Sequence, residues 1–151
     1  MSDPFRIDGK RALVTGANTG IGQAVALGLA ERGAHVVAAG RSSCAETVEQ
    51  IVAAGGTAEA FTLDLADAKS AAERLSEVGP LDVLVNNAGI IRRADAVDFT
   101  EEDWDDVLDT NLKAAFLLSQ VFARSAIAAG SGGRIVNIAS LLSFQGGIRV
   151  P

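Results

Sequence analysis

Short apolar runs with β-branched residues alternate along this chain with longer stretches rich in alanine and leucine. The runs are typical of strands and the longer stretches of helices, and glycine-rich turns separate them. Such alternation favours a parallel sheet covered by helices. Strands are predicted at residues 11–14, 35–39, 58–62, 81–85 and 134–139, and helices at about 21–31, 44–54, 67–77 and 100–130 with a bend near Thr110 and Asn111.

Parallel strands joined through helices require right-handed connections, so helices must cover both faces of the sheet. The consistent architecture is a doubly wound, Rossmann-like α/β sheet with strand order 3-2-1-4-5. The absence of a linker, repeat or low-complexity segment in the sequence predicts that residues 1–151 form one continuous domain. Sheets of this kind usually continue past five strands, so we expect the C-terminal part of the domain to be absent from the sequence.

Charge and cysteine content narrow the classes of partner. Thirteen basic against nineteen acidic side chains give a net charge of −6, which argues against nucleic acid. No apolar run approaches the roughly 18 residues of a membrane span, and Met1 to Lys10 does not resemble a signal peptide. Cys44 is the only cysteine, so we expect no disulfide, no metal site and a reducing, cytoplasmic setting.

The first predicted strand and helix are joined by a glycine-rich turn spanning residues 15–22. Gly16 would permit the tight turn, Gly20 would let a pyrophosphate approach the backbone, and Gly22 would let the helix pack against the strand. The N-terminus of the helix would offer free amides and a positive dipole end to phosphate. Glycines also serve ordinary turns, so this motif alone leaves both interpretations open.

Three further landmarks follow the glycine turn in order. Residues 86–89 read Asn-Asn-Ala-Gly after the fourth strand, Asn111 lies in the long helix, and Ser140 closes the fifth strand. Together with the Gly-x-x-x-Gly-x-Gly spacing, these landmarks resemble the short-chain dehydrogenase/reductase family over essentially the whole chain. The resemblance implies hydride transfer between a nicotinamide cofactor and a carbonyl or secondary alcohol.

The resemblance implies a set of cofactor-binding residues from three turns. They are Gly16, Asn18, Thr19, Gly20, Ile21 and Gly22 at the pyrophosphate and adenosine ribose, Asp64 and Leu65 at the adenine, and Asn87, Ala88 and Gly89 at the nicotinamide ribose. Two alternatives stay open at these positions. Asp64 could instead cap its own turn, and the asparagine pair could bond to neighbouring backbone.

The end of the second strand bears on the choice of cofactor. NAD-specific dinucleotide folds place an acidic residue there, whereas this chain has Ala39, Gly40 and Arg41. Arg41 with Ser42 could hold a 2′-phosphate by charge-assisted hydrogen bonds. We therefore expect NADP as the cofactor, with NAD as the alternative if Arg41 is merely solvated.

By resemblance, Ser140 donates a hydrogen bond to the reacting oxygen and Asn111 holds a water of the proton relay. The family's acid/base tyrosine, with its nearby lysine, would fall just beyond Pro151, and the chain contains no tyrosine. We therefore expect the chain to be part of a longer protein and inactive alone. The apolar helix around Phe116 and Phe122 has more hydrophobic surface than one sheet face needs, and by resemblance to the family it would join subunits into a homotetramer in the complete protein.

Two stretches, residues 90–96 and 141–151, resemble the branch of the family that acts on 2-deoxy-D-gluconate or 2-dehydro-3-deoxy-D-gluconate. Arg93 and Arg149 would clamp the carboxylate of such a sugar acid, and Gln145 would bond a hydroxyl. The arginines could instead pair with Asp95, Asp98 or a neighbouring subunit.

Other functions remain open beside this one. Within the family, gluconate 5-dehydrogenase and 3-ketoacyl reductase are alternatives, although the arginines favour a small anion over an acyl chain. A non-catalytic dinucleotide-binding module would not need Ser140 and Asn111. A bare folding fragment would leave an exposed edge after the fifth strand. Trp104, among acidic residues, is expected to anchor its helix rather than contact substrate.

Overall fold

The computed structural model describes residues 3–151 and contains one parallel sheet with the order β3-β2-β1-β4-β5, which confirms the predicted topology. The strands are β1 (Arg11–Thr15), β2 (His35–Gly40), β3 (Thr57–Thr62), β4 (Val83–Asn86) and β5 (Arg134–Asn137). The helices are α1 (Gly20–Glu31), α2 (Ala45–Ala53), α3 (Ala68–Leu75), α4 (Glu101–Leu108), α5 (Ala114–Ala128) and α6 (Leu142–Gln145). Two short segments complete the chain, a 3-10 turn η1 (Ser76–Val78) and a π-helical segment η2 (Asp109–Lys113).

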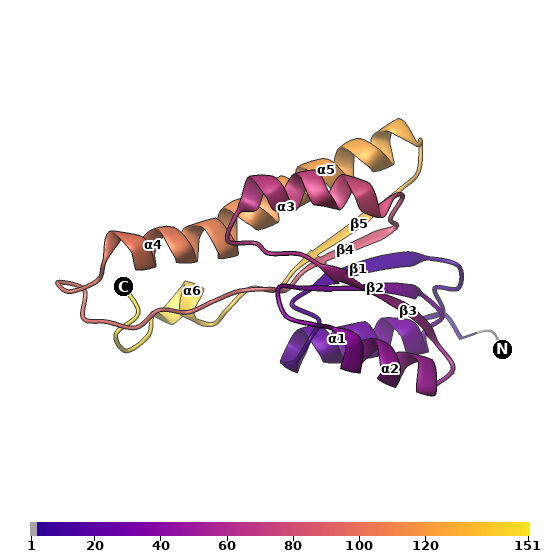
Figure 1. Cartoon of the computed structure of the whole chain (residues 1–151), viewed down its shortest axis with the longest axis horizontal. Coiled ribbons are helices and arrows are strands. Elements are labelled where there is room, and N and C mark those ends of the chain that lie inside the picture. The colour runs from indigo at the N-terminus through magenta and orange to yellow at the C-terminus, as the bar shows by residue number, and fades with distance from the viewer. Residues whose placement is uncertain (1–2) are drawn as a thin grey trace.

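The helices cover both faces of the sheet, as right-handed connections require (Figure 1). Helices α1 and α2 lie on one face, and α3 and α5 lie on the other. Helix α4, helix α6 and the C-terminus extend past one end of the sheet. The segments that follow β4 and β5 therefore meet at the same end.

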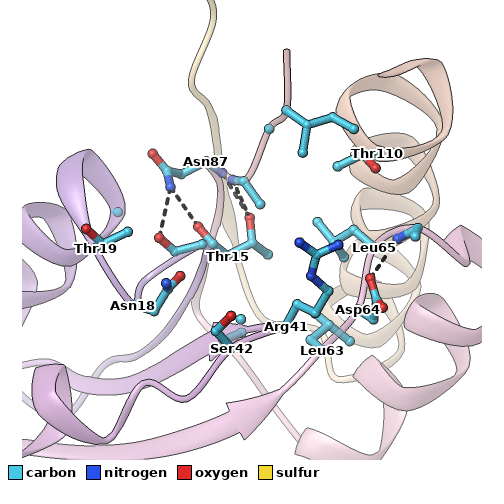
Figure 2. Close-up of a pocket in the computed structure, with 18 of the residues that line it drawn as sticks. Thr15, Asn18, Thr19, Arg41, Ser42, Leu63, Asp64, Leu65, Asn87 and Thr110 are labelled. Atoms are coloured by element: carbon cyan, nitrogen blue, oxygen red, sulfur yellow. Dashed lines mark hydrogen bonds between the residues drawn. The ribbon is translucent and has the colours of Figure 1, made fainter. Parts of the chain in front are cut away.

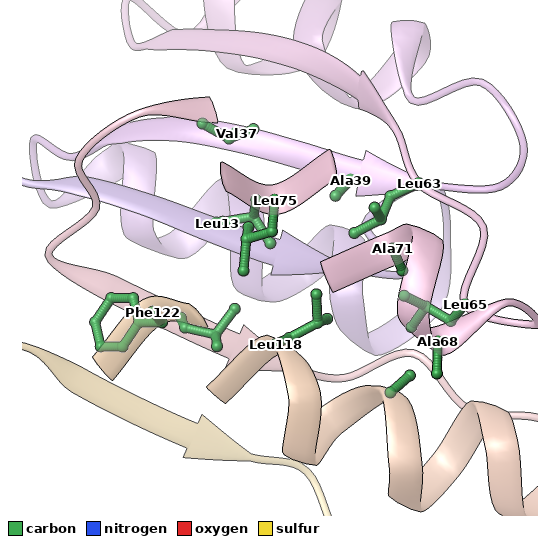
Figure 3. Close-up of a cluster of buried hydrophobic side chains, with 12 residues drawn as sticks. Leu13, Val37, Ala39, Leu63, Leu65, Ala68, Ala71, Leu75, Leu118 and Phe122 are labelled. Carbon is green, nitrogen blue, oxygen red and sulfur yellow. The ribbon is translucent and has the colours of Figure 1, made fainter. Parts of the chain in front are cut away.

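The face under α3 and α5 is packed with large aliphatic side chains (Figure 3). Leu13 of β1 and Leu84 of β4 lie fully buried against Leu118 of α5, with Leu75 and Phe122 beside them. The opposite face is lined by smaller residues. They are chiefly Ala12, Val14, Ala26, Ala30, Val36 and Ala38. Because side chains alternate along a strand, β1 serves both clusters, and the small residues let α1 lie close to the sheet.

Capping residues define several helix ends as predicted. The Asp67 carboxylate accepts a hydrogen bond from the Ser70 amide at 3.0 Å, and the Thr100 hydroxyl accepts one from the Asp103 amide at 3.1 Å. The predicted capping box is only half formed, because the Asp103 carboxylate pairs with Arg92 instead of returning to Thr100. The predicted bend in the long helix coincides with η2.

Some predicted boundaries are wrong. The fourth strand begins at Val83 rather than residue 81, and the Asp82 carboxylate just before it accepts the Arg11 amide at 2.9 Å. The fifth strand ends at Asn137, and α6 was not predicted at all. Side-chain hydrogen bonds compete with regular structure at such ends, and apolar periodicity does not record them.

Strand β5 lies at an open edge of the sheet. It pairs with β4 on one side, and Ile135 and Val136 remain 40% and 45% exposed. Within residues 3–151 no further strand pairs with its other side. Across these same residues, no helix combines the length and apolarity needed to cross a membrane.

Candidate functional site

A cavity of about 460 Å³ opens where β1, β2, β3 and β4 end (Figure 2). In parallel sheets this edge is the usual place for ligands. The structure brings together here eleven of the twelve sequence-predicted cofactor residues, namely Gly16, Asn18, Thr19, Ile21, Gly22, Arg41, Asp64, Leu65, Asn87, Ala88 and Gly89. Gly20 lies in the same turn without lining the cavity.

The backbone of the first turn explains why it needs glycine. Gly16 and Gly20 have φ of 65° and 58°, in the left-handed region that glycine adopts without strain. A Cβ on Gly22 would overlap the Gly16 carbonyl and the Asn87 side chain. A Cβ on Gly20 would meet nothing within 4 Å, so its surroundings leave room for a ligand.

The first turn of α1 lines this cavity, and its first amides have no hydrogen-bond partner among the described residues. Thr19 precedes the helix in an extended conformation, and its side chain makes no capping hydrogen bond. The first turn contains no acidic residue, and the first backbone bond of the helix comes from the Gln23 amide to the Thr19 carbonyl. Free amides and the positive end of the helix dipole therefore favour an anion at this position.

Thr15 joins the turn after β1 to the turn after β4. Its buried hydroxyl accepts hydrogen bonds from the amides of Asn87 and Ala88, each at 3.0 Å, and donates to the Val85 carbonyl at 3.3 Å. The Asn87 amide group donates to the Thr15 carbonyl at 2.8 Å (Figure 2). The backbone-bonded alternative for Asn87 is thus present, while the residue still lines the cavity.

The turns after β2 and β3 form the other end of the cavity. Asp64 accepts a hydrogen bond from the Ala66 amide at 3.1 Å, so its side chain caps its own turn while also facing the cavity. Arg41 is exposed in the cavity wall beside Ser42, and no carboxylate within residues 3–151 forms an ion pair with it (Figure 2). Cys44 lies behind this wall, where burial raises the pKa of its thiol and keeps it protonated.

A second cavity of about 410 Å³ adjoins the first and holds both sequence-predicted catalytic residues, Asn111 and Ser140. Asn111 lies in η2, where its side-chain amide donates to the Ile90 carbonyl and its oxygen accepts the Ile90 amide, both at 2.8 Å. The Ser140 hydroxyl accepts the Leu142 amide at 3.2 Å. The Ser140 proton is therefore available to a ligand, whereas Asn111 holds the segment that follows β4.

Of the four residues predicted to contact substrate, Ser140 lines the second cavity and the other three line neither cavity. Arg93 and Gln145 are exposed, and Arg149 pairs with Asp95 at 3.1 Å, which was the alternative interpretation. Arg149 also has a positive φ of 58°. The structure therefore does not bring these side chains to the site.

Sequence reasoning missed several residues of the cavity walls, and four of them carry polar or charged side chains in the first cavity. They are Thr15, Arg92, Asp106 and Thr110. Arg92 and Trp104 also line the second cavity, and Trp104 remains half exposed rather than serving as a buried anchor. The sequence did contain a signal for Arg92. It directly precedes Arg93, which was predicted to bind the substrate carboxylate, and both lie in the segment 90–96 that was predicted to contact substrate.

A known protein family and several curated proteins are similar to this chain. A model of the short chain dehydrogenase family matches residues 10–151. The chain is 50% identical over 151 residues to a 2-dehydro-3-deoxy-D-gluconate 5-dehydrogenase of Escherichia coli, covering 97% of this chain and 60% of the relative. The corresponding enzyme of Dickeya dadantii is 49% identical with the same coverage. The chain thus spans about 60% of the length of these curated relatives.

Solved structures of similar proteins have the same fold as this chain. An NADP-bound structure from Agrobacterium tumefaciens, provisionally assigned as a 2-deoxy-D-gluconate 3-dehydrogenase, has 57% identity and a TM-score of 0.93. The match covers 99% of this chain and 60% of that one. A gluconate 5-dehydrogenase of Burkholderia cenocepacia in complex with NADP and tartrate has 38% identity and a TM-score of 0.83, over 97% and 59% of the two chains.

Proposed function

This chain belongs to the short-chain dehydrogenase family, and on that premise we propose that it carries the cofactor site of an NADP-dependent oxidoreductase acting on a sugar acid. The observation that carries the proposal is the first cavity, in which turns from four strands converge beside the free amides of α1. The second cavity, with Ser140 and Asn111, adjoins it and would receive the substrate.

The residues present fit a dinucleotide. The amides at the start of α1 would hold the pyrophosphate, because a Cβ at Gly20 would meet open space and the first turn carries no negative charge. Arg41 and Ser42 would hold a 2′-phosphate, and Asp64 with Leu65 would lie at the adenine. NADP is the proposed cofactor and NAD the alternative. The NADP-bound structures of similar proteins support NADP as the first choice.

When bound, the nicotinamide would supply or accept the hydride. Ser140 would donate a hydrogen bond to the substrate oxygen, where negative charge develops during transfer. Asn111 would keep the Ile90 backbone in place at the boundary of the two cavities, and its second amide N–H and second oxygen lone pair would remain available to hold a relay water. The chain contains no tyrosine, so the family's phenolic acid/base group would have to come from outside these residues.

The names of the relatives support 2-dehydro-3-deoxy-D-gluconate or 2-deoxy-D-gluconate as the substrate class. The test is a steady-state assay of the full-length protein that follows reduced nicotinamide by its absorbance. We expect turnover with one of these acids and NADP, and little with a 3-ketoacyl thioester. Cofactor binding without turnover of any deoxygluconate, ketogluconate or gluconate would contradict the enzyme proposal and favour a non-catalytic module.

Replacing Arg41 by alanine should shift the cofactor preference. Loss of one charge-assisted contact to a 2′-phosphate should weaken NADPH binding by about 10- to 100-fold. NADH lacks that phosphate, so its dissociation constant should change little. Both constants are measured by calorimetric titration of the full-length protein, with Lys69→Gln as a control that removes one exposed charge from α3. An equal loss for both cofactors would count against the 2′-phosphate role.

The proposal also includes the oligomeric state of the full-length protein and its cellular location. Leu112, Phe116 and Ile127 remain 64%, 59% and 79% exposed on η2 and α5, which supports burial of this surface in a homotetramer. Analytical ultracentrifugation of the full-length protein tests it, and a monomer would contradict it. A single buried cysteine supports the cytoplasmic setting expected from the sequence.

A further inference from the structure

Arg92 lies in the segment after β4, at the boundary of the two cavities, and lines both of them. It is the only cationic side chain that lines the second cavity within residues 3–151. Most of the remaining wall is apolar, including Phe99, Trp104 and Leu142. A carboxylate in such a cavity needs a positive partner, because a buried charge without one is strongly unfavourable.

Two carboxylates of α4 hold Arg92 in position. Its Nε lies 3.0 Å from the Asp103 carboxylate and its Nη2 lies 2.9 Å from the Asp106 carboxylate. These contacts occupy one edge of the guanidinium and leave Nη1 without a partner among the described residues. A guanidinium already ordered by two ion pairs loses little further entropy when its free nitrogen binds a ligand.

The competing arginines lack this placement. Arg149 pairs with Asp95, Arg93 is exposed, and neither residue lines the first or the second cavity. Arg92 alone combines a free donor with the cavity that contains Ser140.

We infer that Arg92 determines specificity for acidic substrates, with its Nη1 donating to the carboxylate of the sugar acid while Asp103 and Asp106 orient the guanidinium. This inference rests on the proposed function and assigns the carboxylate to a residue other than Arg93 or Arg149. It predicts that selectivity for an acid over its neutral analogue depends on Arg92.

The test measures a ratio in the full-length protein. For wild type and Arg92→Gln, kcat/KM is determined for the sugar acid and for its uncharged carboxamide. We expect Arg92→Gln to lower kcat/KM for the acid by about 10- to 100-fold, as loss of a charge-assisted hydrogen bond implies, with little change for the carboxamide. Arg92→Lys should recover part of the preference, since a point charge replaces the planar fork.

The preference is the ratio of kcat/KM for the acid to kcat/KM for the carboxamide, measured on the same variant. A smaller fraction of folded enzyme lowers both values equally, so it does not change this ratio. Asp103→Asn should reduce the preference less than Arg92→Gln, because it loosens the orientation of Arg92 without removing its charge. Lys69→Gln is the charge control. An unchanged preference in Arg92→Gln would overturn the inference, as would a loss confined to Arg93→Gln or Arg149→Gln. A weaker NADPH affinity in Arg92→Gln with an unchanged preference would also overturn it, by assigning Arg92 to the cofactor.

Failure of the proposed function has a different signature. If wild type turns over no sugar acid, the proposed function fails, and binding of D-gluconate to the NADP-loaded protein is then measured by calorimetry. Binding that weakens at least tenfold in Arg92→Gln would still support a carboxylate contact. Absence of binding to wild type, or equal binding to both proteins, would overturn the inference.

Discussion

Replacing Ser140 by alanine should lower kcat by about 100- to 1,000-fold, the usual effect of removing one hydrogen-bond donor from the oxygen that becomes charged. The physical reason lies in the contacts of the hydroxyl. Its oxygen accepts the Leu142 amide at 3.2 Å, so its proton is not used in that bond and can be donated in the second cavity. The donor would act on charge that develops only during hydride transfer, and kcat should therefore fall more than KM changes.

The measurement is steady-state kinetics of the full-length protein together with NADPH titration. Ser140 is exposed and lies outside the cofactor cavity, so the dissociation constant for NADPH and the thermal midpoint should stay close to wild type. Ser143→Ala removes another hydroxyl from the same cavity and should have a much smaller effect on kcat. If both variants kept wild-type kcat, the assignment of Ser140 as a catalytic residue would be wrong.

Replacing Gly22 by alanine should damage both folding and cofactor binding. The added methyl group would overlap the Gly16 carbonyl, which is backbone and has no rotamer to change, as well as the Asn87 amide group. Overpacking of this kind costs about 1–3 kcal/mol of the free energy of unfolding. If α1 moved to relieve this overlap, the amides proposed to bind pyrophosphate would shift with it. The affinity for NADPH should therefore also fall.

A matched control lies in the same helix. A Cβ at Gly28 would meet nothing within 4 Å, so Gly28→Ala should gain about 0.5–1 kcal/mol from the helix preference of alanine. Chemical denaturation and NADPH titration of both full-length variants distinguish the two effects. A Gly22→Ala protein as stable as wild type, with unchanged affinity, would show that the turn can open without cost.

Much of the site was accessible from the sequence because it lies on backbone turns. Gly16, Asn18 and Asn87 occupy the ends of β1 and β4, and parallel strands bring such ends to one edge of the sheet whatever the details of packing. Turn chemistry is local, so a glycine at the start of a predicted tight turn indicates a positive φ. Gly16 has the positive φ expected of a tight turn.

Side-chain assignments outside these turns were less accessible. Arg92 and Arg93 are neighbours in the sequence, yet Arg92 lines both cavities and Arg93 lines neither. The difference comes from Asp103 and Asp106, which capture Arg92 from α4. Composition and periodicity contain no information about which of two adjacent long side chains a distant helix will bind.

The sequence by itself determined the alternation of strands and helices, the strand order and the glycine turn. These follow from short-range preferences and from the right-handed connection rule, which do not depend on particular long-range contacts. Tertiary structure alone decided that Thr15 joins two turns, that Asn111 binds the Ile90 backbone and that Arg92 faces the second cavity. Each of these depends on a hydrogen bond or ion pair between segments far apart in the chain, whose meeting only the packed helices and sheet impose.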